Sequence, residues 1–258
     1  MLVNAINYRG MFALYLKEVK RFLKVYNQTL LAPVVTSLLF LAVFSLALGH
    51  NVSYVKDIPF QQFVAPGLIM MAMVQNAFAN SSSTLIMGKV MGNIIDLLMP
   101  PFSSLEIVVA LSLGAVTRGL MVGLLVGGAV YLFIPFQLHS FGALLYYSFM
   151  ASLLLALLGM VGGIISETFD QMAAVTSYVI TPLAFLSGTF YSVHHLPPFW
   201  FHVSQYNPFF YMIDGFRYAI TGYHDSPLMN GMLCLLGCCV VLWTAAHIMI
   251  AKGYRLKD

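Results

Sequence analysis

The chain has 258 residues, of which 60% are hydrophobic and only 8% are charged, and its formal net charge is +3. A soluble domain carries about 25% charged residues, so this composition excludes an ordinary soluble protein. Charged side chains are absent from five long intervals, which are residues 25–55, 58–88, 119–166, 171–213 and 226–251. A bilayer core of roughly 30 Å needs about 20 mostly apolar residues per helix. We therefore expect a multi-pass membrane protein.

A hydropathy window of about 19 residues places six transmembrane helices on the chain. They cover approximately residues 30–49, 61–83, 107–134, 143–165, 172–192 and 228–250. No long polar segment remains for a soluble unit, so residues 1–258 are expected to form a single transmembrane domain. The first 28 residues lack the apolar core and cleavage site of a signal peptide, so the first transmembrane helix is expected not to be cleaved off. The predicted fold class is an all-α integral membrane protein.

The positive-inside rule orients the chain with both termini in the cytoplasm. In this orientation nine basic residues are inside, namely Arg9, Lys17, Lys20, Arg21, Lys24, Lys89, Lys252, Arg255 and Lys257. Only Lys56 and Arg217 are outside. The segment 193–227 is then exterior.

Residues 1–28 are predicted to form an amphipathic helix at the cytoplasmic surface, ahead of the first span. Its apolar positions are Phe12, Leu16, Val19, Phe22, Leu23 and Tyr26. The basic residues Lys17, Lys20, Arg21 and Lys24 project elsewhere. Such a helix can rest on the anionic inner leaflet, and it can also receive a cytoplasmic partner. Both interpretations remain open from the residues alone.

A second cytoplasmic element is predicted over residues 87–101. Lys89, Asn93 and Asp96 recur at helical spacing, and the pair Pro100-Pro101 stops the segment. We expect a short helix on the membrane surface, which either lies passively at the interface or contacts a soluble subunit.

Glycines repeat every four residues within the third predicted span, at Gly119, Gly123 and Gly127. Small residues at this spacing let helix backbones approach closely, so we expect a structural packing role, within one chain or between two. Arg118 is the basic residue deep in this span, and pairing or snorkelling is more typical of such a residue than substrate binding. The three cysteines, in the last span, are expected to be free packing residues.

The exterior segment between the fifth and sixth spans is rich in aromatic residues and interrupted by prolines. It is predicted to be re-entrant, with short half-helices. Its rings either form an interfacial aromatic belt or line a path for a passing amphiphile or sugar. The tentative path residues are Phe190, Tyr191, Trp200, Phe209, Tyr211 and Phe216. Asp214 and Arg217 are three residues apart, which favours a structural ion pair that holds the loop.

Catalytic and metal-binding motifs are not recognisable in the sequence. The exterior histidines match no strong metal-ligand spacing, so no metal site is expected. Gly88-Lys89 is followed by Val90 rather than Ser or Thr, so the chain lacks a phosphate-binding loop. The chain is therefore predicted not to be an enzyme.

The order of several short motifs, taken with the six-span layout, resembles the ABC-2 type transport permeases. These motifs are Phe63-Val64-Ala65-Pro66-Gly67-Leu68, Leu97-Leu98-Met99-Pro100, Thr181-Pro182-Leu183, Leu186-Ser187-Gly188-Thr189-Phe190-Tyr191, Leu196-Pro197, and Asn207-Pro208 followed by Asp214, Phe216 and Arg217. The resemblance covers almost the whole chain and is nearest to the small bacterial permeases that lack a fused ATPase.

This resemblance implies an exporter subunit in the bacterial inner membrane, in which two copies of the chain pair with two copies of a separate ATP-binding cassette ATPase. ATP and magnesium would bind the partner, and no cofactor would bind this chain. The implied ATPase-coupling residues are Lys17, Lys20, Arg21, Lys89, Asn93 and Asp96. Where the family's surface helix often has an Arg and a Glu, this chain has Gly92 and Ile95, so that charge pairing does not carry over.

The implied cargo is a lipid, a drug-like molecule or a glycan, and membrane lipid rather than nucleic acid is the other expected partner. The alternative function is a self-contained secondary transporter or channel. Such proteins place ionisable groups at mid-membrane, and the predicted spans contain almost none beyond Arg118. A membrane-embedded enzyme is a third alternative, for which only the exterior histidines offer candidate residues.

Overall fold

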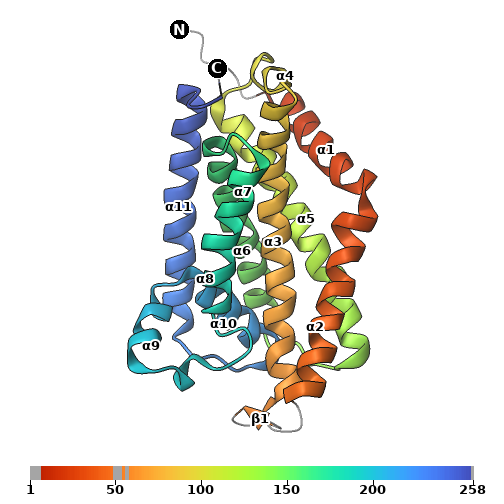
Figure 1. Ribbon diagram of the computed structural model, residues 1–258, viewed down its shortest axis with the longest axis vertical. Coiled ribbons are helices and arrows are strands. Elements are labelled where there is room, and N and C mark those ends of the chain that lie inside the picture. Colours follow the sequence, from red (N-terminus) through yellow and green to blue (C-terminus); the bar gives the residue numbers. More distant parts are fainter. Residues whose placement is uncertain (1–6, 49–53, 56–57, 257–258) are drawn as a thin grey trace.

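The computed structural model describes residues 7–48, 54–55 and 58–256, which form a bundle of long helices (Figure 1). The α-helices are α1 Tyr8–Lys24, α2 Ala32–Leu48, α3 Phe60–Val90, α4 Ile95–Leu98, α5 Ser104–Phe133, α6 Phe141–Ile165, α7 Phe169–Val175, α8 Thr181–Phe185, α9 Pro198–Gln205, α10 Pro208–Thr221 and α11 Leu228–Lys252. Two π-helical segments are η1 Asn27–Leu31 and η2 Thr176–Ile180, and η3 Val193–His195 is a 3-10 turn. Strands β1 Tyr54–Val55 and β2 Ile58–Pro59 pair antiparallel. Lys56, Lys257 and residues 1–6 of the predicted interfacial helix lie outside the described residues.

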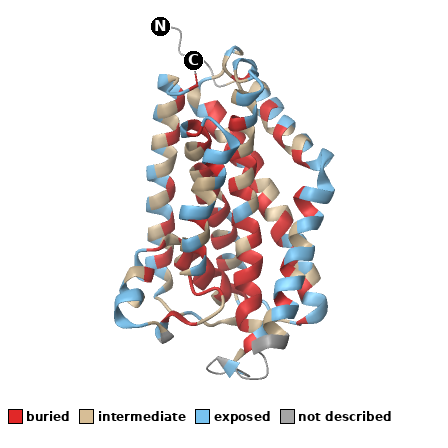
Figure 2. Ribbon diagram, viewed as in Figure 1, coloured by how far each residue is buried: buried red, intermediate tan, exposed pale blue. Residues whose placement is uncertain are grey.

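Five helical segments within the described part are long and apolar enough to cross a bilayer, namely Asn27–Ser45, α3, α5, α6 and α11. A helix satisfies all of its backbone hydrogen bonds internally, which is required in hydrocarbon. Helices α3 and α6 are the most buried and occupy the centre of the bundle (Figure 2). The fold is therefore the expected all-α membrane type.

The two ends of the bundle differ in what they carry. The start of α1, α4 and the last turn of α11 lie at one end, which we call the α4 end (Figure 1). Helix α9 and the β1 strand lie at the opposite end, which we call the α9 end (Figure 1).

The fifth predicted span, 172–192, has different bounds in the structure. Its helical part runs from Phe169 through η2 to Phe185 and is followed by turns. Gly188 adopts a positive φ of 73°, and the hydroxyl of Thr189 donates to the carbonyl of Ala184 at 3.4 Å. These local bonds end the helix before the apolar sequence does. It is not among the five segments above.

The predicted surface helix over 87–101 is also smaller than expected. Helix α3 continues to Val90, so Lys89 lies in its last turn. Gly92 then turns the chain with a φ of 72°, a conformation that costs glycine little. Only the four residues of α4 form a separate helix.

Glycines bring α5 and α6 against α3. A Cβ added to Gly119 would lie 3.1 Å from the carbonyl oxygen of Met73. A Cβ added to Gly159 would lie 2.5 Å from the carbonyl oxygen of Phe78. At Gly127 the nearest neighbour atom would be 3.9 Å away. The α5 glycines therefore pack helices of the same chain, most closely at Gly119 and Gly123, where Met73 is the neighbour.

Candidate functional site

Helix α1 packs against α5 and meets α3 through side-chain bonds, and its buried side carries a carboxylate. Leu14, Glu18 and Phe22, spaced four residues apart, are its buried residues. Gly114 of α5 lies directly under Glu18, since a Cβ added there would be 2.7 Å from the Cβ of Glu18. Tyr15 and Thr117 also share a hydrogen bond of 3.1 Å between their hydroxyls. The close approach of α1 to α5 thus directs Glu18 toward α3.

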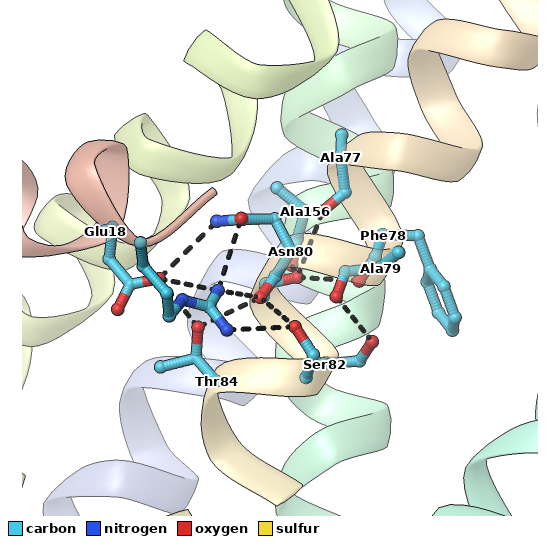
Figure 3. Close-up of polar contacts among 11 residues, drawn as sticks. Glu18, Ala77, Phe78, Ala79, Asn80, Ser82, Thr84 and Ala156 are labelled. Carbon is cyan, nitrogen blue, oxygen red and sulfur yellow. Dashed lines mark hydrogen bonds and ion pairs between the residues drawn. The ribbon is translucent and has the colours of Figure 1, made fainter. Parts of the chain in front are cut away.

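Glu18 and Arg21 of α1 join a polar cluster on α3, which we call the α1–α3 cluster (Figure 3). Arg21 Nη2 lies 2.9 Å from Glu18 Oε2 and donates to the carbonyl of Asn80 at 2.8 Å. Thr84 Oγ1 donates to Glu18 Oε2 at 2.7 Å. Arg21 Nη1 donates to Ser83 Oγ at 3.1 Å. This cluster is the main polar attachment of α1 to α3.

Some polar atoms of the α1–α3 cluster lack a hydrogen-bond partner. Glu18 is 1% exposed, and its Oε1 has no hydrogen-bond partner among the described residues. The same holds for Arg21 Nε, although the Arg21 side chain is 28% exposed. Buried polar atoms without partners are costly, so this cluster stabilises the α1–α3 contact less than a fully bonded network would.

A groove of about 310 Å³ lies between α1 and the α3–α4 connection, next to the cluster. We call it the α1–α4 groove. Its lining includes four of the predicted coupling residues, Lys17, Arg21, Asn93 and Asp96. These side chains come from two segments far apart in the sequence, and they place both charge signs around one opening.

The other two predicted coupling residues lie elsewhere. Lys89 Nζ donates to the carbonyls of Ile164 and Ser166, the latter at 3.1 Å, at the end of α6. Lysine at this position satisfies the free carbonyls of a helix C-terminus. Lys20 lines a different groove, between α1, α3 and α5. Lys89 is thus part of the helix packing.

The tentative path residues lie in several separate parts of the described chain. Phe209 is buried in the core, and Trp200 is half exposed on α9. Phe190 stacks on Phe44 of α2 with ring centroids 4.3 Å apart. The Tyr191 hydroxyl donates to the Phe185 carbonyl at 3.1 Å.

The remaining two aromatic residues lie on α10. Phe216 borders an apolar groove of about 580 Å³ between α5, α6 and α10. Tyr211 is half-buried beside Gly231 of α11. The predicted aromatic path is therefore dispersed over several surfaces.

Among the described residues, Asp214 and Arg217 form no ion pair within 4.0 Å, although their opposite charges still attract each other. Asp214 accepts hydrogen bonds from the backbone nitrogens of Asp225 and Ser226 at 2.6 and 2.9 Å. Burial raises the pKa of its carboxyl, and these bonds act in the opposite direction. Arg217 Nη1 instead lies 4.0 Å from Asp225 Oδ2. Local spacing predicted a partner three residues away, but the folded loop brings Asp225 closer to the guanidinium.

Arg217 is fully buried and ties the α9 end to α3. Its Nη2 donates to the Gly188 carbonyl at 2.7 Å, and its Nε donates to the Phe63 carbonyl at 3.2 Å. The guanidinium also lies 3.8 Å from the centroid of the Phe63 ring. Asp225 further accepts hydrogen bonds from Ser192 and Tyr223. We call these contacts of Arg217, Asp214 and Asp225 the α9-end network.

Sequence reasoning missed Glu18, Asn80 and Asp225. The signal for Glu18 was its place between Leu14 and Phe22 at four-residue intervals, which puts it on the apolar stripe. The partner Asn80 can be recognised only once α1 and α3 are placed side by side. Among the described residues, no three His, Cys, Asp or Glu side chains gather closely enough for a metal ion.

Comparisons with known proteins identify the family of this chain. A family model described as ABC-2 type transporter matches residues 9–221. The inner membrane transport permease YadH of Escherichia coli K12 is 36% identical over 246 residues, covering 95% of this chain and 96% of that protein. A protein of the same description from Shigella flexneri has the same 36% identity over 246 residues.

Proposed function

This chain belongs to the ABC-2 type transporter family and is a multi-pass protein of the inner membrane, and we propose that it is the permease subunit of an exporter driven by a separate ATPase subunit. The observation that carries the proposal is the α1–α4 groove, where Lys17, Arg21, Asn93 and Asp96 converge. ATP and magnesium bind the partner in this proposal. The groove is the surface that receives the partner.

The α4 end faces the cytoplasm in this arrangement. The described basic residues at this end include Arg9 at the start of α1, Lys252 in the last turn of α11 and Arg255 just after it, and an excess of basic residues is typical of the cytoplasmic side. The α9 end, which carries the aromatic helices α9 and α10, then faces the exterior.

The α1–α3 cluster transmits the partner's motion. When ATP closes the soluble subunits, they push on the α1–α4 groove, and the bonds of Glu18 and Arg21 to α3 carry the displacement into the bundle. A partner can shift this equilibrium only by binding one state more tightly than the other. The unpaired Glu18 Oε1 and Arg21 Nε supply groups whose partners can differ between states.

The transport path lies between two copies of the chain in this proposal, and the cargo is a lipid, a drug-like molecule or a glycan. Helices α7, η2 and α8 form the sixth span, because their 17 continuous residues reach the lower limit of about 17 for a transmembrane helix. The proline-started helices α9 and α10 form the re-entrant pair. Helices of this kind are tolerated near the membrane where protein satisfies their backbone.

Co-purification tests the proposal. The chain is tagged in its native host and solubilised gently, and its partners are identified by mass spectrometry. We expect a stoichiometric soluble subunit that hydrolyses ATP. A chain that purifies alone and moves solute in liposomes without ATP would instead establish a self-contained secondary transporter or channel.

A variant of Asp96 tests the docking surface within this complex. Asp96→Asn should lower ATPase stimulation by about fivefold or more, because coupling between sites is typically worth 1–3 kcal/mol. The matched control is Asp170→Asn, which removes an exposed carboxylate from α7, outside the α1–α4 groove. ATPase rates of the two purified complexes are compared. Equal rates would remove Asp96 from the coupling surface.

A further inference from the structure

A second groove, of about 870 Å³, lies between α1, α3 and α5 on the side of α1 away from α4. We call it the basic groove. Five basic side chains contribute to its lining, namely Lys17, Lys20, Arg21, Lys24 and Arg118. None of the described residues that line it is acidic. The groove therefore concentrates positive charge at one place on the bundle.

The nearby carboxylate of Glu18 pairs with Arg21 alone, which leaves Lys17, Lys20, Lys24 and Arg118 without a carboxylate partner among the described residues. Glu18 is already bonded to Arg21 and Thr84. Arg118 Nη2 donates to the neutral amide oxygen of Asn76 at 2.8 Å, and Arg118 Nε has no partner among the described residues. Uncompensated positive charge is costly at membrane depth, so such residues normally pair with an anion or reach water. The arrangement calls for an anionic ligand.

Apolar side chains complete the lining. Leu16, Phe22, Val25 and Met87 border the same groove as the basic residues. Arg118 lies about 21 Å along α5 from Ser104, whereas Lys17, Lys20 and Lys24 are exposed on α1. The groove thus combines a charged lining with apolar surface, as a ligand with an anionic head and a hydrocarbon tail requires.

We propose that the basic groove binds the phosphate headgroup of an anionic lipid from the leaflet at the α4 end. Guanidinium groups match phosphate oxygens in pairs, and lysines add point charges around them. Basic pockets between transmembrane helices on the cytoplasmic side bind such headgroups in other membrane proteins. The acyl chains lie along Leu16, Phe22 and Val25. The site stands whatever the transported cargo is, and only its cytoplasmic orientation rests on the proposed function.

A lipid titration tests the site on the full-length protein. The purified chain is titrated in detergent with dioleoyl phosphatidylglycerol or dioleoyl phosphatidylcholine, and bound lipid is counted by native mass spectrometry. We expect saturable binding of the glycerol lipid and weaker, non-saturable binding of the choline lipid. Inorganic phosphate at equal concentration should leave the bound lipid unchanged, because it lacks the apolar part.

Two variants locate the binding. Lys20→Gln removes one exposed charge and should lower the apparent affinity for phosphatidylglycerol about fivefold. Arg118→Gln should lower this affinity at least as much, since Arg118 is the cation that lies deepest in the basic groove. Arg9→Gln is the matched control, because Arg9 is exposed on the same helix and does not line the groove.

Three results would overturn the proposal. The first is equal binding of both lipids. The second is unchanged affinity in Lys20→Gln, a substitution at an exposed position that leaves folding intact. The third is displacement of the lipid by inorganic phosphate alone, which would indicate a site for a free anion.

Discussion

The two ends of the molecule bury an arginine beside a carboxylate in opposite ways. In the α9-end network, Arg217 is 1% exposed and donates to two backbone carbonyls, while Asp225 accepts hydrogen bonds from Ser192 and Tyr223. In the α1–α3 cluster, Arg21 is 28% exposed and Glu18 Oε1 has no partner among the described residues. Each carboxylate keeps one oxygen without a hydrogen-bond partner among the described residues, Asp225 Oδ2 in the first network and Glu18 Oε1 in the second. The networks differ in exposure, because the first is closed and the second borders two open grooves.

In the proposed mechanism, this difference separates an anchor from a coupling element. The α9-end network binds α3, α10 and the loops around Gly188 and Asp225 to one another, so a rearrangement would break many bonds together. The α1–α3 cluster joins only α1 to α3. A partner that acts on α1 can therefore rearrange the α1–α3 cluster at a much lower cost in free energy than the α9-end network.

Removing the buried arginine gives the largest expected effect. Arg217→Met should lower the free energy of unfolding by about 3–5 kcal/mol, because Asp225 is left buried without its cationic neighbour. Thermal unfolding of the purified chain in detergent measures the loss. A midpoint equal to that of the unchanged protein would contradict the role of the network as an anchor.

Helix α3 carries residues of both networks, so a change in its packing against α6 should give the second-largest loss of stability. Gly159→Leu should cost about 1–3 kcal/mol, since a Cβ there meets the backbone of Phe78. Gly128→Leu is the matched control, because a Cβ there meets nothing within 4 Å. The two unfolding midpoints are compared in one detergent. Equal losses would show that the close contact of Gly159 with Phe78 adds nothing specific to stability.

Changing Glu18 should separate stability from coupling. Glu18→Gln keeps an oxygen for Thr84 but weakens the charge-assisted bond to Arg21, so we expect a stability loss of about 1–2 kcal/mol. Stimulation of the partner ATPase should fall about fivefold or more. Glu167→Gln is the control, because its pair with Arg255 is exposed and contributes little. Full stimulation in Glu18→Gln would contradict the coupling role of the cluster.

The smallest effect is expected at Lys89. Lys89→Gln weakens the cap on the carbonyls of Ile164 and Ser166, which should cost about 0.3–1 kcal/mol. ATPase stimulation per folded molecule should stay unchanged, unlike that of Glu18→Gln. Both quantities are measured on the same preparation. A large loss of ATPase stimulation with normal stability would show that Lys89 takes part in coupling.

Much of the bundle could be predicted from charge-free intervals alone. The predicted spans 143–165 and 228–250 agree within two residues with α6 and α11. Hydropathy could not locate the end of α8, because the turn at Gly188 is set by backbone conformation and short side-chain bonds. It also could not divide α3 from α4, since Gly92 is a single residue within an apolar run.

The contacts of the site were less predictable because they depend on tertiary neighbours. A helical projection of α1 places Arg21 among the basic residues, yet Asn80 and Ser83 of α3 draw its guanidinium inward. Spacing suggested an ion pair for Arg217, but carbonyls more than 25 residues away were available to it. Both arginines are among the residues that the sequence singled out, but their partners could be identified only from the fold.

Photocrosslinking tests the central claim most directly, namely that an ATPase drives the bundle through the α1–α4 groove. A benzophenone side chain is introduced in place of Asn93, or in place of Tyr206, which is 88% exposed on the α9 side. The complex is irradiated in native membranes, and adducts are identified by mass spectrometry. We predict an adduct with the ATPase subunit from position 93 and none from position 206. An adduct from position 206, or none from position 93 in an intact complex, would contradict the account.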